Sequence, residues 1–180
     1  MKLREGSFRC TALEIAIIGL MVAILEVGKV ALEGIPNCEV VTLFVILFTI
    51  FLGRKILYVT VAFVGLECLR HGISIWVIMY LYIWPVIGLV ALPFRKIKNP
   101  LFWAFYSGLT GLGFGTACSL VYPVFLGWSF RQTGVWIAAG FPFDIYHAVY
   151  NFILALLLFY PLNTALTRIK RMLTEDDGLR

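Results

Sequence analysis

The sequence predicts an all-α integral membrane protein built as a bundle of six transmembrane helices. Of its 180 residues, 61% are hydrophobic and only 14% are charged, and the mean hydropathy is +0.93. A soluble domain is nearer half apolar and a quarter charged, so lipid must cover the excess apolar surface. The apolar runs are long and continuous, which favours helices over the alternating pattern of a transmembrane β-barrel.

The apolar runs divide the chain into spans within a single membrane domain, 1–180. We expect the spans at about 11–33, 40–52, 56–69, 73–94, 100–126 and 135–166. The first follows the basic segment MKLREGSFRC and has no clear cleavage pattern, so we interpret it as a retained span. The second follows a Pro36-Asn37 turn and is shorter than the roughly 20 residues of a perpendicular span.

The later spans carry their own packing signals. Ser107, Gly111, Gly115 and Ser119 recur every four residues in the fifth span and predict a helix that another helix crosses closely. We expect the last span to kink around Pro142 and to end near Pro161. The tail TRIKRMLTEDDGLR is expected to be a charged, exposed end.

The charge distribution predicts how the bundle is oriented. With six spans both termini lie on one side, and most Lys and Arg residues fall on that side: Lys2, Arg4, Arg9, Arg54, Lys55, Arg95, Lys96, Lys98, Arg168, Lys170, Arg171 and Arg180. Arg70 and Arg131 fall on the other side, with Lys29 inside the first span. By the positive-inside rule the termini are cytoplasmic.

Polar residues inside the last span define the candidate site. In FPFDIYHAVYNFILALLLFY, residues Asp144, His147 and Asn151 share one helical face. Ionisable groups in a span indicate a functional site, although hydrogen bonding to neighbouring helices is the alternative. The candidate substrate-binding residues are Asn37, Glu39, Glu67, Arg70, His71, Trp76, Tyr80, Trp84, Tyr122, Asp144, His147 and Asn151.

Several charged and aromatic residues of these spans have simpler interpretations. Glu67 and Arg70 are three residues apart and can form an ion pair with each other. Lys29 lies one turn from Glu26 and Glu33 and can neutralise its own helix end. Tyr80 and Trp84 share a face, where they serve either as the wall of a ligand pocket or as ordinary core.

The sequence resembles a known family of membrane proteins in three places. The first helix contains the AxxxA pattern Ala12-Leu13-Glu14-Ile15-Ala16; the second region is PNCEVVTLFVILFTIFLGRK; and the last is FPFDIYHAVYNFILALLLFYPL. In these features the chain resembles the substrate-binding S components of energy-coupling factor (ECF) vitamin transporters. Among these, it is most similar to the cobalamin-associated subgroup.

The resemblance implies a transport role in a bacterial cell membrane. An S component captures a vitamin at the extracellular face, docks on a transmembrane coupling subunit with two ABC ATPases, and topples to deliver its cargo. It is not an enzyme and has no ATPase of its own. The residues implied to contact the coupling subunit form a small-residue stripe: Ala12, Ala16, Gly19 and Ala23.

The ligand implied is cobalamin or a related corrinoid, although the residue types equally suit pantothenate, folate or a modified purine. No cofactor, structural metal or nucleic-acid partner is expected. An intramembrane hydrolase built on Glu67, Arg70, His71 and His147 is an alternative, but the chain lacks paired catalytic carboxylates. A solitary transporter or an assembly scaffold is another, although we find no inverted repeat.

Overall fold

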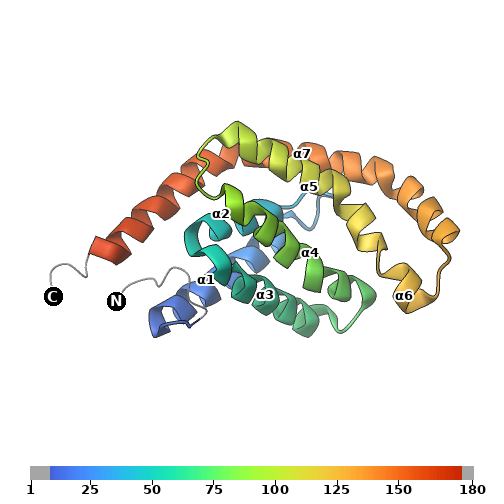
Figure 1. Ribbon diagram of the computed structural model, residues 1–180, viewed down its shortest axis with the longest axis horizontal. Coiled ribbons are helices and arrows are strands. Elements are labelled where there is room, and N and C mark those ends of the chain that lie inside the picture. The colour runs from blue at the N-terminus through green and yellow to red at the C-terminus, as the bar shows by residue number, and fades with distance from the viewer. Residues whose placement is uncertain (1–8, 176–180) are drawn as a thin grey trace.

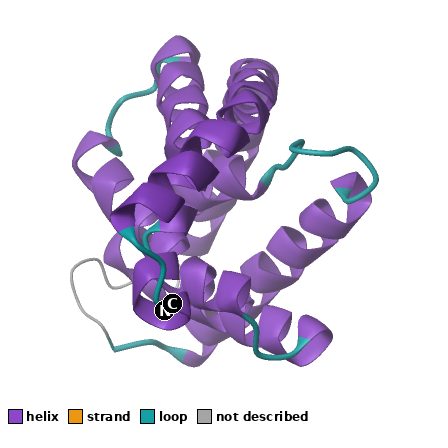
Figure 2. Ribbon diagram, turned by 90° about the vertical axis from the view of Figure 1, so that its right-hand side faces the viewer, coloured by secondary structure: helices purple, strands orange, loops and turns teal. Residues whose placement is uncertain are grey.

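The computed structural model describes residues 9–175, and this part of the chain consists of helices and loops without a strand (Figure 2). Its elements are α1 (Ala12–Leu32), α2 (Val41–Leu52), η1 (Gly53–Lys55), α3 (Ile56–His71), α4 (Ile75–Ala91), η2 (Leu92–Phe94), α5 (Pro100–Ser119), α6 (Tyr122–Leu126) and α7 (Phe130–Glu175). Lys2, Arg4 and Arg180, which the sequence analysis places on the cytoplasmic side, lie outside the described residues.

Within the described residues, five helical segments are long and apolar enough to cross a membrane. They are Ala12–Leu32, Val41–His71, Ile75–Phe94, Pro100–Leu126 and Phe130–Leu173. This architecture is compatible with a multi-pass membrane protein. The 12 residues of α2 extend only about 18 Å, less than the hydrocarbon core of a bilayer. The segment Val41–His71 contains both α2 and α3, so six separate spans remain a prediction.

Helix α2 forms the centre of the molecule. Its residues from Val41 to Thr49 are buried on all sides, apart from the partly buried Phe44. A helix that is apolar around its whole circumference is typical of a buried core element. The surrounding helices α1, α3, α4 and α7 therefore pack around α2.

A sharp turn at Gly53 separates α2 from α3. Gly53 has a φ of +63°, a conformation that favours glycine, and a Cβ there would lie 2.8 Å from Nη1 of Arg95. The next turn carries Lys55, which is buried and pairs with Glu14 at 2.5 Å. The turn between α2 and α3 is thereby joined to the first turn of α1.

The start of α1 and the end of α7 lie at the same end of the molecule, at the left of Figure 1. Lys170 on α7 donates a hydrogen bond to the carbonyl of Phe51 at 3.0 Å, beside the turn that holds Lys55. We call the region around Lys55, Arg95 and Lys170 the basic end. The side of the membrane that it faces remains a prediction.

Helix α7 differs from the expected last span. It is continuous from Phe130 to Glu175 and includes both Pro142 and Pro161, so the expected end near Pro161 was wrong. Beyond Pro161 the side chains of Leu162, Leu166 and Leu173 pack against the core. This packing continues the helix past the proline, because it stabilises an apolar helical face on both sides of the missing hydrogen bond.

Helices α5 and α7 lie side by side and make the most extensive helix–helix contact in the molecule (Figure 1). The predicted close crossing is confirmed at Gly111, where an added Cβ would lie 2.9 Å from backbone atoms of His147 and Ala148. Gly108 faces Phe152 at 3.3 Å in the same way. The absence of side chains on this face of α5 allows the two backbones to approach.

We predict that Gly111→Ala destabilises the protein. The new methyl group would meet backbone atoms of α7, which cannot rotate away, and we expect a cost of about 1–3 kcal/mol. The measurement is the thermal unfolding midpoint of purified protein in detergent. Gly113→Ala is the matched control in the same helix, since nothing lies within 4 Å of its added Cβ. Equal midpoints for the two variants would contradict the assigned packing.

Candidate functional site

A buried ion pair joins α1 to α3. The ammonium group of Lys29 donates a hydrogen bond to Oε2 of Glu67, whose side chain is fully shielded from solvent. A carboxylate in such surroundings is costly unless it is paired. The Lys29–Glu67 pair therefore allows a charge to exist between these helices.

A second set of ion pairs lies at the same helix interface, closer to solvent. Arg70 on α3 donates to Glu26 at 3.1 Å and to Glu33 at 2.8 Å. The sequence interpretation paired Glu67 with Arg70, and Lys29 with Glu26 and Glu33. The observed salt bridges run between helices instead, because α1 and α3 pack against each other and bring opposite charges within reach.

An aromatic ladder extends from this ion-pair region through the protein. Consecutive rings lie with centroids 4.9–5.4 Å apart, in the order His71, Trp76, Tyr80, Trp84, Phe114 and His147. Most neighbouring rings meet edge to face, the arrangement that their quadrupoles favour. The Lys29 ammonium lies 5.2 Å from the Trp76 ring and 5.6 Å from the Tyr80 ring, so it also makes cation–π contacts.

The far end of the ladder meets a hydrogen-bonded group around Glu39. Thr42 donates to Glu39 through its backbone N–H at 2.8 Å and through its hydroxyl at 2.6 Å. His147 Nε2 lies 3.2 Å from Glu39 Oε1, and the Asn151 amide donates to the Thr42 hydroxyl at 3.3 Å. The loop before α2 is thereby held against α7.

Glu39 carries a negative charge in this arrangement. Burial acts to raise the pKa of Glu39, but the interaction with His147 and the hydrogen bonds from Thr42 outweigh burial. The pKa therefore lies below the ordinary value of 4.5. Near neutral pH this carboxylate accepts hydrogen bonds and does not donate them.

Asp144 lies one turn before His147 and contacts α5. Its Oδ1 accepts a hydrogen bond from the backbone N–H of Gly115 at 3.0 Å. A Cβ at residue 115 would lie 2.5 Å from the same oxygen, so a larger residue there would displace the Asp144 carboxylate. The predicted shared face of Asp144, His147 and Asn151 is confirmed, and all three side chains are buried.

We call the buried and partly buried residues joined by these contacts the polar cluster. Its members are Glu26, Lys29, Glu39, Thr42, Glu67, Tyr80, Trp84, Phe114, His147 and Asn151. Arg70, His71 and Trp76 lie at its edge, and Asp144 lies beside it. Glu26, Lys29, Thr42 and Phe114 were not among the predicted site residues. The predicted shared face of Tyr80 and Trp84 is confirmed, since their ring centroids lie 5.3 Å apart.

The structure gives two of the predicted residues other roles. Asn37 has a φ of 59° and shapes the turn before α2, a left-handed conformation that asparagine tolerates. Tyr122 packs on Trp128 at 4.7 Å and on Trp136 at 5.6 Å between ring centroids. It therefore belongs to a second aromatic group, around the start of α7.

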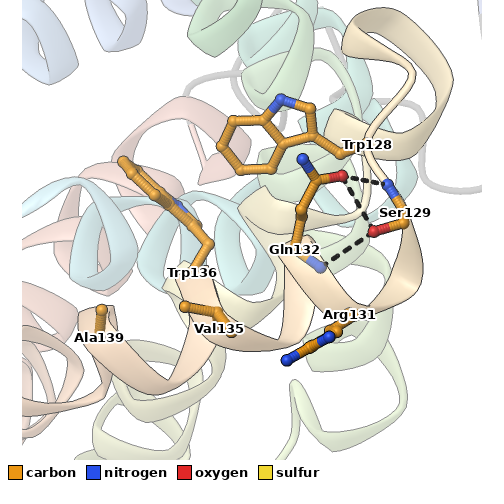
Figure 3. Close-up of a pocket in the computed structure, with 7 residues that line it drawn as sticks. All are labelled: Trp128, Ser129, Arg131, Gln132, Val135, Trp136 and Ala139. Carbon is orange, nitrogen blue, oxygen red and sulfur yellow. Dashed lines mark hydrogen bonds between the residues drawn. The ribbon is translucent and has the colours of Figure 1, made fainter.

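That second group borders a cavity of about 660 Å³ (Figure 3). Figure 3 shows the Trp128 ring above the Gln132 carboxamide, while Arg131 points away from both indole rings. Ser129 and Gln132 form reciprocal hydrogen bonds, at 2.8–3.3 Å, which cap the start of α7. The cavity walls are mainly apolar and aromatic, unlike the charged polar cluster.

The chemistry available in the polar cluster is hydrogen bonding and stacking. Within residues 9–175, no group of three or more His, Cys, Asp or Glu side chains is arranged to hold a metal ion. The arrangement combines carboxylates, an amide and a run of aromatic faces in an apolar interior. Such groups can hydrogen-bond to and stack with one another and with a small organic molecule.

We predict strong coupling between Lys29 and Glu67. Lys29→Met would leave the buried Glu67 carboxylate unpaired, which should lower the free energy of unfolding by about 3–5 kcal/mol. Glu67→Gln would leave the Lys29 ammonium group without its ion-pair partner. The double variant removes both charges, so it should be more stable than the sum of the single effects predicts. Unfolding midpoints of the four proteins in detergent provide the measurement. Additive effects would show that the pair contributes nothing specific.

Comparisons of this chain with models of protein families, with curated proteins and with solved structures found no match.

Proposed function

We propose that this protein is the membrane-embedded substrate-binding subunit of an ECF-type ABC importer in a bacterial cell membrane. The observation that carries the proposal is the polar cluster: buried carboxylates and an amide lie beside an aromatic ladder inside helices suited to lipid. Polar groups are costly in such surroundings, and a ligand that uses them accounts for their presence. The protein acts as a binding and transport subunit, without chemistry of its own.

The proposed substrate is cobalamin or a related corrinoid. A corrinoid combines a broad apolar ring system with a fringe of amide groups. The rings of Trp76, Tyr80 and Trp84 offer apolar faces, while Glu39, Glu67 and Asn151 offer hydrogen-bond acceptors. Pantothenate, folate or a modified purine is the alternative cargo within the same function.

The charge distribution supports an orientation for this subunit. Lys55, Arg95 and Lys170 lie at the basic end, and by the positive-inside rule that end faces the cytoplasm. Glu26, Glu33 and Arg70 belong to the outer part of the molecule. The substrate therefore enters from the extracellular side and reaches the polar cluster first.

The outer face of α1 supports docking on a coupling subunit. Ala12, Ala16, Gly19 and Ala23 are all exposed, and nothing lies within 4 Å of a Cβ built on Gly19. Small residues allow the backbone of a partner helix to approach closely in lipid. The coupling subunit binds this stripe, and two ABC ATPases attached to it supply the energy for toppling and release.

The first test is binding of labelled cobalamin to purified protein in detergent, with pantothenate and folate as competitors. We expect saturable binding that only corrinoids displace. Tyr80→Leu should weaken binding about two- to tenfold, because the loss of an aromatic contact costs about 0.5–1.5 kcal/mol. Tyr146→Leu is the matched control, since Tyr146 is 60% exposed on α7. Folded protein that binds none of these vitamins would exclude the proposed function.

We predict that Ala16→Leu impairs transport and leaves substrate binding intact. The larger side chain would keep a partner helix away from the exposed stripe without entering the polar cluster. The measurements are cobalamin uptake by cells that express the complete importer, and binding by the isolated subunit. Ala138→Leu, at an exposed position on α7, is the control and should transport normally. Parallel loss of binding and uptake in Ala16→Leu would contradict the docking role.

A further inference from the structure

The polar cluster contains buried polar atoms that have no hydrogen-bond partner within the protein. Three are oxygens: Oε2 of Glu26 and Oε1 of Glu67, which belong to carboxyl groups close enough to interact with each other, and Oδ1 of Asn151. One is a donor, Nε1 of Trp84. Glu67, Asn151 and Trp84 are each at most 2% exposed. Buried polar groups are normally satisfied, so four such atoms along one set of contacts indicate places where a ligand bonds.

The hydrogen-bond network determines which atom of Asn151 is left over. The Thr42 hydroxyl has one proton, and it donates that proton to Glu39 Oε1 at 2.6 Å. The hydroxyl oxygen can then only accept, so the NH₂ group of Asn151 must face it, at 3.3 Å. The Asn151 carbonyl oxygen therefore has no partner in the network and offers a fixed acceptor.

The charged side chains of this region also disfavour an anionic ligand. Among the shielded groups of the region, four carboxyl groups, Glu26, Glu39, Glu67 and Asp144, stand against two permanent cations, Lys29 and Arg70, so carboxyl groups outnumber the cations that can pair with them. Both cations already bind carboxylates of the cluster. An entering anion would meet this excess in a region shielded from water, where charge interactions are strong.

The unpartnered atoms follow the aromatic ladder. Glu67 binds Lys29, whose ammonium group contacts the rings of Trp76 and Tyr80. Trp84 is the next ring, and Asn151 lies one turn beyond His147 at the end of the ladder. The unpartnered acceptors therefore lie toward both ends of the ladder, with one indole donor between them.

We propose that the site selects uncharged or cationic compounds rich in hydrogen-bond donors, and rejects carboxylates. The inference rests on the proposed function and names its substrate class: planar or ring-containing molecules with amide or amine edges. Within the candidate cargoes it favours corrinoids, whose fringe carries amides, and purines. It disfavours pantothenate and folate, which are anions. Glu26 and Glu67 are the residues that determine this specificity.

The test compares matched ligand pairs that differ in one charged group. Cobalamin is paired with its monocarboxylic acid, in which one peripheral amide is hydrolysed, and panthenol is paired with pantothenate. The wild-type protein is expected to bind one of these pairs. Within that pair, we expect the uncharged compound to bind at least about tenfold more tightly than the acid, because like charges in a buried site repel. Dissociation constants are measured by equilibrium binding in detergent.

The preference should depend on the buried carboxylates. Glu26→Gln removes one negative charge while Arg70 keeps its bond to Glu33, so the variant is expected to fold and to discriminate several-fold less between amide and carboxylate. Glu67→Gln should act in the same direction and is the second variant. Glu33→Gln is the control, since the Glu33 side chain is 51% exposed and water screens its charge.

Each outcome separates this inference from the proposed function. Tighter binding of pantothenate, folate or the corrinoid acid than of uncharged partners would overturn the specificity and leave a vitamin-binding subunit in place. An amide preference that persists in both Glu26→Gln and Glu67→Gln would overturn the role of these carboxylates. No saturable binding of any compound by folded protein would overturn the proposed function, and the inference with it.

Discussion

The interior of this protein depends on the pairing of charges that cannot reach water. Glu67 is fully buried, and the Lys29 ammonium group is its ion-pair partner between α1 and α3. The same contact places Lys29 against Trp76 and Tyr80, which fixes α4 beside the ion pair. One salt bridge therefore organises three helices and begins the aromatic ladder.

Close packing of α5 on α7 completes the site from the opposite side. Because Gly111 carries no side chain, α7 approaches near enough for His147 to meet Phe114 at the end of the ladder. Gly115 then receives the Asp144 carboxylate on its backbone N–H. The proposed ligand site thus lies between two kinds of contact, charge pairing at α1 and α3 and steric fit at α5 and α7.

Helix α1 has separate roles on its different faces. Glu14 at its start is tied to Lys55 at the basic end, and Lys29 near its other end is tied to Glu67. Between these two ion pairs the stripe that includes Ala16 and Gly19 is exposed, and nothing lies within 4 Å of a Cβ built on Gly19. A partner helix can therefore bind the stripe without disturbing the polar cluster, which is what a subunit that binds cargo and also docks on an importer requires.

The sequence by itself determined the helical class, most helix positions and the residues that share a face, because composition and helical periodicity are local properties. Asp144, His147 and Asn151, and likewise Tyr80 and Trp84, lie together as their spacing predicts. Only the tertiary structure decided the partners: Lys29 with Glu67, Arg70 with Glu26 and Glu33, and Tyr122 with a separate group. It also continued α7 through Pro161. Those outcomes depend on which helices pack against each other, and spacing along one helix carries no information about its neighbours.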